Sequence, residues 1–190
     1  MTRIMVIAGS VRPGRVALPI ARWVESELEG LDDVEVDLVD LGELALPLMD
    51  EPNHPRLREY TQPHTFAWSE RVEAADAFIL VSPEYNHSYS PALKNALDYL
   101  SQEWHRKPVT FVSYGGVSAG TRAVGALKPV IAALGLVPTA ASVEINFPGN
   151  SITEEGVFAP TGTHRSRLEQ AAAELLELAG ALRPLRALAA

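Results

Sequence analysis

Residues 77–100 of the chain read AFILVSPEYNHSYSPALKNALDYL, and this stretch decides the fold class. Its first five residues are all apolar, which is typical of a strand buried on both faces of a parallel sheet. Ser90-Pro91 then predicts the start of a helix, because serine caps helix N-termini and proline is favoured at the first helical position. A strand-to-helix connection needs only about two to six residues, but residues 82–89 form a longer one that carries glutamate, tyrosine, asparagine and histidine. The stretch therefore predicts a strand, then a loop that does more than connect two elements, and then a helix.

The same alternation of short apolar strands and amphipathic helices continues on both sides of this stretch. Strands are predicted over residues 3–8, 34–40, 77–81, 107–114 and 137–145, the last with a kink, and helices over residues 16–29, 69–75, 91–100, 121–134 and 164–182. Ser69 is the expected cap of the second of these helices. Residues 46–64 contain four prolines and little periodicity, which predicts a long excursion with at most a short helix.

Strands that alternate with helices predict right-handed crossovers, and hence one parallel sheet with helices on both faces. The length of 190 residues suits one domain, so we expect residues 1–190 to form a single α/β unit. In an open parallel sheet, ligands bind beyond the carboxyl ends of the strands, where the strand order reverses. With the order 2-1-3-4-5, the first and third strands flank that point and the fourth lies beside it.

The composition excludes several classes of function. The formal net charge is −8 at pH 7, so binding to a nucleic-acid backbone by counterion release is not expected. The chain contains no cysteine, which excludes disulfides, thiolate catalysis and cysteine-bound iron–sulfur clusters. The five histidines lack the spacing of a metal site. The apolar run at the start of the sequence is too short to span a membrane and resembles a first strand more than a signal peptide. We expect a cytoplasmic protein that binds neither a metal nor a membrane.

Three connections carry the unusual residues of the sequence, namely residues 9–15, 82–89 and 113–120. They follow the first, third and fourth predicted strands, so with this strand order they meet at one edge of the sheet. Residues 41–48, after the second strand, carry no comparable set of polar side chains. The sequence therefore predicts a single binding site built from three distant segments.

The first connection, GSVRPGR (residues 9–15), suits a single terminal phosphate. Ser10 can donate its hydroxyl, and the amides that follow, with the helix start near Val16, favour an anion. Arg12 and Arg15 add charged donors. The spacing is neither G-x-G-x-x-G nor a Walker A loop, which disfavours a dinucleotide pyrophosphate or a magnesium–nucleotide site. A glycine turn beside surface arginines is the alternative that this loop alone leaves open.

The second connection suits the ring of a flavin. Pro83 stiffens the exit from the strand, Tyr85 can lie against an aromatic ring, and Asn86 with nearby amides can hydrogen-bond the ring's edge. Two residues of this connection, Glu84 and His87, each have two possible interpretations. Glu84 either supports the loop or is a solvent-facing carboxylate, and His87 is either a proton donor or a mobile loop residue.

The third connection, SYGGVSAG (residues 113–120), is rich in glycine, which lets a backbone approach a ligand closely. The amides of Gly115 and Gly116 are expected at the pyrimidine end of the flavin. Negative charge builds there on reduction, so donors at that end favour the reduced form. A glycine-rich turn without a ligand is the alternative.

GSVRPGR, PEYNHSYSPALKNALDYL and SYGGVSAGTRA, in this order and spacing, resemble the NADPH-dependent FMN reductase family of flavodoxin-like proteins. The resemblance spans about residues 3–136, and the middle motif is the most specific. It implies a flavodoxin-like three-layer sandwich, with a five-stranded parallel sheet in the order 2-1-3-4-5, that binds FMN non-covalently. It also implies a homodimer or a tetramer.

The resemblance carries over to individual positions of this sequence. It places Ser10 and Arg12 at the FMN phosphate, Pro83, Glu84, Tyr85 and Asn86 along the isoalloxazine ring, and Ser113, Gly115 and Gly116 at the ring's other edge. Many members have a hydroxyl residue where Arg15 stands, so Arg15 either compensates for that contact or meets the extra phosphate of NADPH. Val16 completes the expected cofactor-binding set. Tyr89, Tyr99 and Trp104 could join a subunit interface or belong to the core.

The activity that the resemblance implies is an FMN-dependent NAD(P)H oxidoreductase, also described as an FMN or quinone reductase. Hydride would pass from NAD(P)H to N5 of FMN, and then, in a ping-pong sequence, to a flavin, quinone, azo dye or chromate. No residue is assigned as a catalytic acid or base, because the flavin carries the chemistry. Two alternatives stay open: a flavodoxin-like electron carrier without NAD(P)H turnover, and a sensor that controls a partner through its flavin. The acceptor and the preference between NADH and NADPH are not readable from the sequence.

Overall fold

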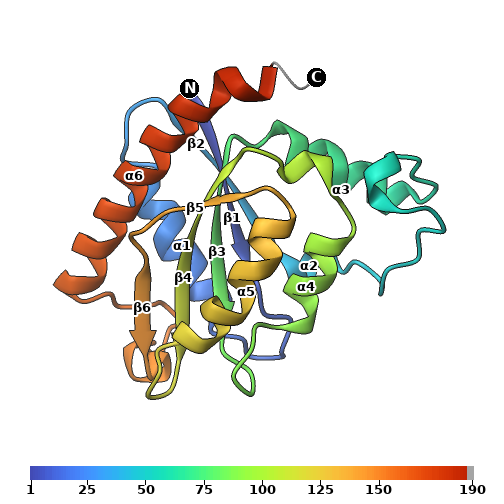
Figure 1. The fold of residues 1–190 in the computed structure, drawn as a ribbon. Coiled ribbons are helices and arrows are strands. Elements are labelled where there is room, and N and C mark those ends of the chain that lie inside the picture. The colour runs from blue at the N-terminus through green and yellow to red at the C-terminus, as the bar shows by residue number, and fades with distance from the viewer. Residues whose placement is uncertain (188–190) are drawn as a thin grey trace.

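Strands and helices alternate along the chain in the computed structural model, which describes residues 1–187 (Figure 1). The strands are β1 (Thr2–Ala8), β2 (Val34–Asp40), β3 (Ala77–Pro83), β4 (Pro108–Gly115), β5 (Val137–Pro138) and β6 (Val143–Asn146). The α-helices are α1 (Ala17–Leu28), α2 (Leu41–Leu44), α3 (Pro63–Ala74), α4 (Pro91–Asp98), α5 (Thr121–Ala133) and α6 (Gly162–Ala187). Short 3-10 turns form at η1 (Pro55–Leu57), η2 (Gln102–Trp104) and η3 (Pro148–Ser151).

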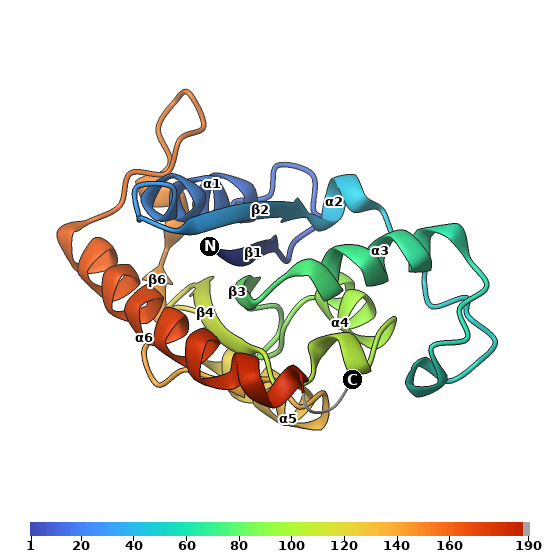
Figure 2. The same cartoon turned by 90° about the horizontal axis from the view of Figure 1, so that it is seen from above.

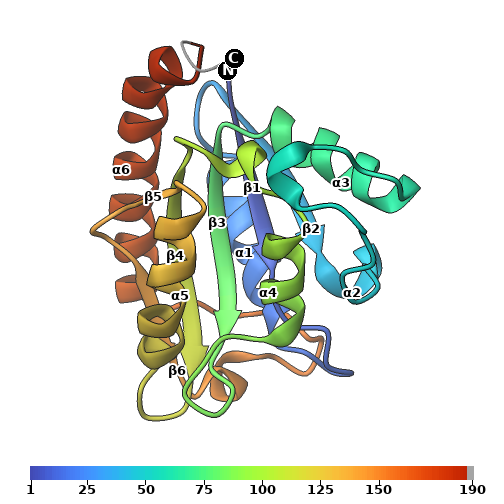
Figure 3. The ribbon, with the colours of Figure 1, turned by 45° about the vertical axis from the view of Figure 1, so that its right-hand side comes forward.

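All strand pairs are parallel and follow the order β2-β1-β3-β4-β5, which confirms the predicted topology. The register aligns Ala8 of β1 with both Asp40 of β2 and Val81 of β3. It also aligns Pro83 of β3 with Tyr114 of β4. The strands therefore end at one edge of the sheet, where the arrowheads of β3, β4 and β6 point in the same direction (Figure 3).

The predicted fifth strand is divided into two short strands, β5 and β6, which both pair with β4. Between them, the backbone N–H groups of Ala140 and Ala141 donate to the carboxylate of Glu174 on α6, at 2.8 and 2.9 Å. Pro138 has no N–H to donate to a ladder. The kink expected in residues 137–145 is therefore a full interruption of the strand, supported by a helix from the neighbouring layer.

Helices cover both faces of the sheet, as Figure 2 shows from above. α1 and α6 contribute to the hydrophobic core on one face, and α3, α4 and α5 to the core on the other. Along β1, Ile4, Val6 and Ala8 belong to the first core while Met5 and Ile7 belong to the second. Every residue from Ile4 to Ala8 is therefore buried, because a strand covered on both faces has no side chain directed to water.

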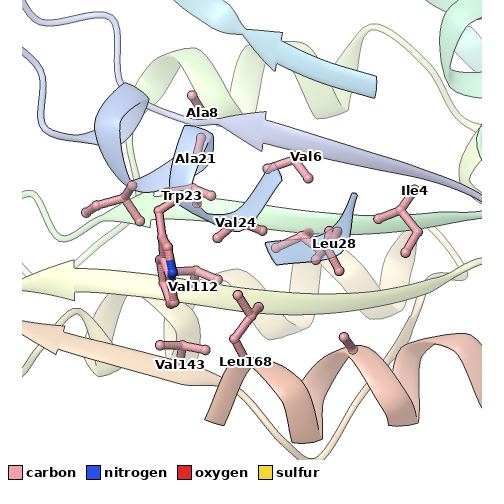
Figure 4. Close-up of a cluster of buried hydrophobic side chains, with 14 of the residues drawn as sticks. Ile4, Val6, Ala8, Ala21, Trp23, Val24, Leu28, Val112, Val143 and Leu168 are labelled. Atoms are coloured by element: carbon pink, nitrogen blue, oxygen red, sulfur yellow. The ribbon is translucent and has the colours of Figure 1, made fainter. Parts of the chain in front are cut away.

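The first core is shown in Figure 4, where side chains of β1, α1, β4, β6 and α6 meet. Trp23 of α1 lies in this core and packs against Phe158, with ring centroids 5.3 Å apart. Trp68, Tyr99 and Trp104 are fully buried in the second core. Tyr99 and Trp104 are therefore core residues and not interface residues, which resolves the alternative left by the sequence.

Three helices, α2, α3 and α6, differ from the sequence prediction by more than two residues. α3 begins at Pro63 instead of residue 69, because proline occupies its first position and Gln62 is extended. Ser69 is therefore not a cap: it lies inside α3, is buried, and donates to Glu103 at 2.7 Å. The short helix α2 was not predicted, and its N-cap is Asp40, which accepts from the N–H of Gly42. α6 is longer at both ends than the predicted helix over residues 164–182.

Residues 46–62, which we call the excursion, lie outside the layers and connect α2 with α3 (Figure 3). Asn95 of α4 holds one end, because its side chain donates to Pro47 O at 2.6 Å and accepts from Met49 N at 3.0 Å. Tyr60 holds the other end by donating to Glu103 at 2.7 Å. The predicted short helix of this segment is η1. No helix among residues 1–187 combines the length and the apolar character needed to cross a membrane.

Candidate functional site

The three predicted connections meet at the carboxyl edge of the sheet. They jointly line a cavity of about 200 Å³. The lining residues are Ser10, Arg12, Pro13, Gly14, Arg15 and Val16 after β1, Tyr85 after β3, and Tyr114 at the end of β4. We call the surface formed by residues 9–16, 84–88 and 113–120 the cradle. The central expectation from the sequence, that three distant segments meet, agrees with this geometry.

The first connection has the donors that a phosphate needs. α1 begins at Ala17 without a side-chain cap and without an acidic residue in its first turn, so its N-terminus favours an anion. Within residues 1–187, the backbone N–H groups of Val11, Gly14 and Val16 donate to no other protein group. Arg12 lies beside them, with its guanidinium carbon 5.7 Å from the centre of the Tyr85 ring. These groups fit a single terminal phosphate.

Ser10 and Tyr85 join the first connection to the second. Their hydroxyl oxygens lie 2.6 Å apart, and Ser10 is only 1% exposed. Tyr114, which the sequence reading did not select, closes the cavity from β4, and burial raises the pKa of its hydroxyl. A signal for it existed, because Tyr114 is the last large side chain of a strand that ends at the predicted site.

Arg15 is engaged by a residue that the sequence reading did not include. Its guanidinium binds both carboxylate oxygens of Asp40, with Nε 3.1 Å from Oδ1. Gly42 lies against this pair, since a Cβ there would come within 3.0 Å of the guanidinium. The end of β2 therefore does contribute to the site, through the side chain of Asp40, which is 3% exposed. Arg15 still lines the cavity, but much of its hydrogen-bonding capacity is used inside the chain.

The second connection is a tight hairpin. Tyr85 and Ser88 exchange two backbone hydrogen bonds of 2.8 and 3.0 Å, and Asn86 and His87 between them have φ of +48° and +69°. Two successive left-handed residues are the requirement of a type I′ turn, which asparagine tolerates well. The turn conformation therefore favours asparagine at residue 86, independently of any ligand that its amide binds. His87 adopts the same region at a higher steric cost.

Glu84 points into the protein and not to solvent, so the interpretation as a solvent-facing carboxylate is wrong. Its side chain is 7% exposed and accepts from Ser118 Oγ and from Arg122 Nε, each at 2.7 Å. Burial alone would raise the pKa of Glu84, but the hydrogen bond from Ser118 and the charge of Arg122 outweigh burial and lower it. Glu84 is therefore an ionised carboxylate that connects the second connection with the third.

The third connection is folded tightly on itself. Ser113 is buried and donates its hydroxyl to Ala119 O at 2.9 Å, so this hydroxyl is used within the loop. A Cβ on Gly115 would lie 3.1 Å from the N atom of Gly120. Close packing within the loop therefore already favours glycine at residue 115. Within residues 1–187, the N–H groups of residues 116–118 donate to no other protein group. We call residues 116–118 the free-amide segment. Its N–H groups are the donors that could face the edge of a flavin.

The predicted residues thus fall into two groups. Ser10, Arg12, Arg15, Val16 and Tyr85 line the cavity itself. Pro83, Glu84, Ser113 and Gly115 support the surrounding loops by packing or hydrogen bonds, while Asn86 and Gly116 lie on the hairpin and on the free-amide segment. Together the phosphate donors, an aromatic side chain and free backbone amides fit a phosphorylated flavin such as FMN.

A larger apolar cavity of about 520 Å³ also has Arg15 in its lining. It is bounded by the first connection, α2, α4 and the beginning of the excursion, with Leu46 and Leu48 among its walls. Within residues 1–187, its only charged lining residue is Arg15, which also lines the smaller cavity. The two cavities are therefore neighbours that share one guanidinium.

Comparisons with known proteins show the family of the chain. A sequence model of the NADPH-dependent FMN reductase family matches residues 2–147, which include all three connections. An NAD(P)H-dependent FMN reductase of Schizosaccharomyces pombe is 37% identical over 181 residues, which cover 93% of this chain and 90% of the relative. An NAD(P)H-dependent FMN reductase of Saccharomyces cerevisiae is 32% identical over 92% of this chain and 97% of the relative.

The fold is also that of a solved flavoenzyme. The NAD(P)H:(acceptor) oxidoreductase FerB of Paracoccus denitrificans superposes with a TM-score of 0.75, over 94% of this chain and 97% of that one. Its sequence identity to this chain is 22%, so the likeness concerns the fold. Together with the strand order β2-β1-β3-β4-β5, this likeness confirms the flavodoxin-like sandwich.

Proposed function

The chain belongs to the NADPH-dependent FMN reductase family, and on that premise we propose that residues 1–190 form one domain that passes hydride from NAD(P)H through bound FMN to a small acceptor. The protein is an oxidoreductase, and its cofactors are FMN and NAD(P)H. The observation that carries the proposal is the cavity of about 200 Å³ that the three connections line together.

Different residues of the cradle would bind different parts of FMN. Ser10, Arg12 and the free amides at the start of α1 would hold the phosphate, with Arg15 fixed beside it by Asp40. Tyr85 would offer its ring to the isoalloxazine. The amides of residues 116–118 would donate to the edge of the ring where reduction adds negative charge.

FMN held by the cradle would supply the redox chemistry that carries hydride from NAD(P)H to the acceptor. The chain contributes position and polarity. No side chain of the cradle has to take up or release a proton for this, so we assign no catalytic acid or base. Variants of the cradle should therefore change binding and rate more than they change the kind of reaction.

The acceptor is proposed to be a planar compound such as a free flavin, a quinone or an azo dye. Relatives of this chain include an FMN-dependent NADPH-azoreductase of Staphylococcus haemolyticus and a probable NADPH:quinone oxidoreductase of rice. The apolar cavity beside Arg15 supports this class, because it presents apolar walls and one guanidinium next to the cradle. Steady-state turnover with a quinone, an azo dye and free FMN would rank the candidates.

A homodimer or tetramer is also part of the proposal. Leu48, Leu57 and Phe66 are exposed by 82%, 60% and 48%, and all three lie on the excursion or on α3. Exposed apolar side chains along one stretch of the chain, residues 48–66, support an interface with another copy of the chain. Sedimentation or light scattering would measure the oligomeric state. The cytoplasmic location stays a prediction.

The proposal is tested by spectroscopy of the purified protein. We expect it to bind FMN, to show a flavin spectrum, and to lose the absorbance of oxidised flavin when NADPH is added without oxygen. A protein that stays colourless with excess FMN would contradict the proposal. A protein that binds FMN but is not bleached by NADPH or NADH would instead be the electron carrier or the sensor.

A further inference from the structure

Glu84 and Arg122 connect parts of the cradle that are far apart in sequence. Besides its bonds to Ser118 and to the Arg122 side chain, Glu84 accepts from the backbone N–H of Arg122 at 3.3 Å. The same guanidinium donates from Nη1 to Nε2 of His87, 2.9 Å away, because arginine has no acceptor atom. One ion pair therefore holds the hairpin of residues 85–88, the free-amide segment and the start of α5.

The carboxylate that accepts from the N-terminus of α5 belongs to Glu84, which lies in another loop, and the geometry of the N-cap explains why. The N-cap residue is Gly120, with φ of +85° and no side chain. A Cβ there would lie 2.7 Å from the N atom of Tyr114 and 2.9 Å from its O atom. A serine or aspartate cap is therefore sterically excluded at residue 120, and Glu84 supplies the acceptor and negative charge that a helix N-terminus favours.

We propose that Glu84 and Arg122 are positioning residues that act as a neutral ion pair, holding the second and third connections around the flavin and setting its reduction potential. The inference rests on the proposed function, because it requires FMN in the cradle. It concerns residues that connect the flavin-binding segments and that need no contact with the flavin themselves.

The charges of the pair matter because reduction changes the charge of the flavin. A positive charge near the cradle favours the reduced cofactor and a negative charge disfavours it. In the wild-type protein the two charges lie 2.7 Å apart and largely cancel at a distance. Removing one partner therefore leaves the other partner's charge acting on the flavin.

The test uses single and double substitutions in the full-length protein. Glu84→Gln should raise the midpoint potential of bound FMN, because the charge of Arg122 is no longer balanced. Arg122→Gln should lower it, because the carboxylate remains. The double variant Glu84→Gln/Arg122→Gln should return close to the wild-type potential. Each single variant should also weaken FMN binding by about tenfold, since charge-assisted hydrogen bonds between the connections are lost.

Two further variants serve as controls. Arg122→Lys keeps the charge and should keep the potential near that of the wild type, although it loses the guanidinium that contacts both Glu84 and His87. Glu27→Gln removes the same charge from another glutamate–arginine pair, with Arg165 at 3.2 Å, in α1 near the end remote from the cradle. It should change neither the potential nor the dissociation constant of FMN. The side chain of Arg122 is 47% exposed, so its variants test the inference even if Glu84→Gln does not fold.

Opposite shifts are the distinguishing result. If both single variants shift the potential in the same direction, or if neither shifts it, the pair does not set the potential and the inference is wrong. FMN binding and NADPH bleaching by the wild type are measured in the same series. Their failure would overturn the proposed function, whereas their success with unshifted variants would overturn only the role of the pair.

Discussion

Glu84 and Glu103 are two buried glutamates that hold two different loop regions of the molecule. Glu84 holds the cradle and has a charged partner, Arg122. Glu103 is fully buried and holds the excursion, with three close partners that are all neutral: Tyr60 OH and Ser69 Oγ at 2.7 Å, and Ser101 N at 3.1 Å. The guanidinium of Arg58 lies farther away, at 3.4 Å.

The two arrangements have different consequences. Burial alone would raise the pKa of each carboxyl group, and in each the hydrogen-bond donors outweigh burial and lower the pKa. Around Glu103 most of the compensation comes from neutral dipoles in the interior, so the group serves stability. Around Glu84 it comes from the hydroxyl of Ser118 and from the exposed arginine Arg122, which tie the second connection to the third, so a change there is expected to reach a bound ligand.

The largest effect is expected from Glu103→Ala. It leaves the donors of Tyr60, Ser69 and Ser101 without their acceptor and should destabilise the fold by about 4 kcal/mol, as breaking a buried, hydrogen-bonded charge site does. Urea unfolding of the apoprotein measures it. The FMN dissociation constant of the folded fraction should not change, and a tenfold weakening would show that the excursion and the cradle are not separate regions.

A smaller loss of stability, combined with a loss of FMN binding, is expected from Gly120→Ala. An alanine at φ of +85° with its Cβ against the backbone of Tyr114 should cost about 3 kcal/mol. The matched control is Gly125→Ala in the same helix, where nothing lies within 4 Å of the new Cβ. That control should stabilise the protein by about 0.8 kcal/mol. Equal effects of both substitutions on FMN affinity would count against a special role of residue 120.

Two hydroxyl deletions compare the regions directly. Ser69→Ala and Ser118→Ala each remove a donor 2.7 Å from a glutamate. Ser69→Ala should cost about 2 kcal/mol because its partner is fully buried, and Ser118→Ala about 1 kcal/mol because Arg122 remains beside Glu84. Only Ser118→Ala should weaken FMN binding. Titration of the apoproteins with FMN, followed by flavin fluorescence, distinguishes the two.

The smallest effect concerns pH. The folded-state pKa of Glu103 is lowered below the unfolded value of about 4.3, so its contribution is present above that pH and is lost as pH falls through the folded pKa. Glu103→Gln has no such group to titrate. The stability difference between wild type and Glu103→Gln should therefore shrink as the pH is lowered from 5 to 3, as measured by urea midpoints. A constant difference over this range would mean that the pKa of Glu103 is the same in the folded and unfolded states.

Much of the fold could be predicted because its signals are local. The apolar run of residues 77–81 indicates a strand covered on both faces, and Ser90-Pro91 indicates the start of α4, where the serine does accept from Leu93 N at 3.1 Å. The start of α3 was missed because Pro63 follows a proline-rich segment and its signal reads equally as loop. Where β5 and β6 are separate strands the sequence predicted only a kink, because the Glu174 carboxylate that binds the N–H groups between them lies more than thirty residues away.

The candidate site shows the same division. Ser10, Arg12 and Tyr85 were found because they follow strands whose ends meet at one edge, and strand order alone brings them together. Asp40 was missed because it belongs to no unusual stretch, and Arg122 because the motif that contains it, SYGGVSAGTRA, gives no sign of its partner. Each becomes part of the site only by pairing with a residue from another segment, Arg15 or Glu84.

By itself the sequence determined the alternation of strands and helices, the edge at which the site lies, and the family to which the chain belongs. These follow from apolar periodicity, capping residues and short motifs, which act over a few neighbouring positions. Tertiary structure alone decided which charges are balanced, because an ion pair such as Glu84 with Arg122 depends on distances between loops that share no sequence. A side chain's role at this edge therefore depends on its partner as well as its type.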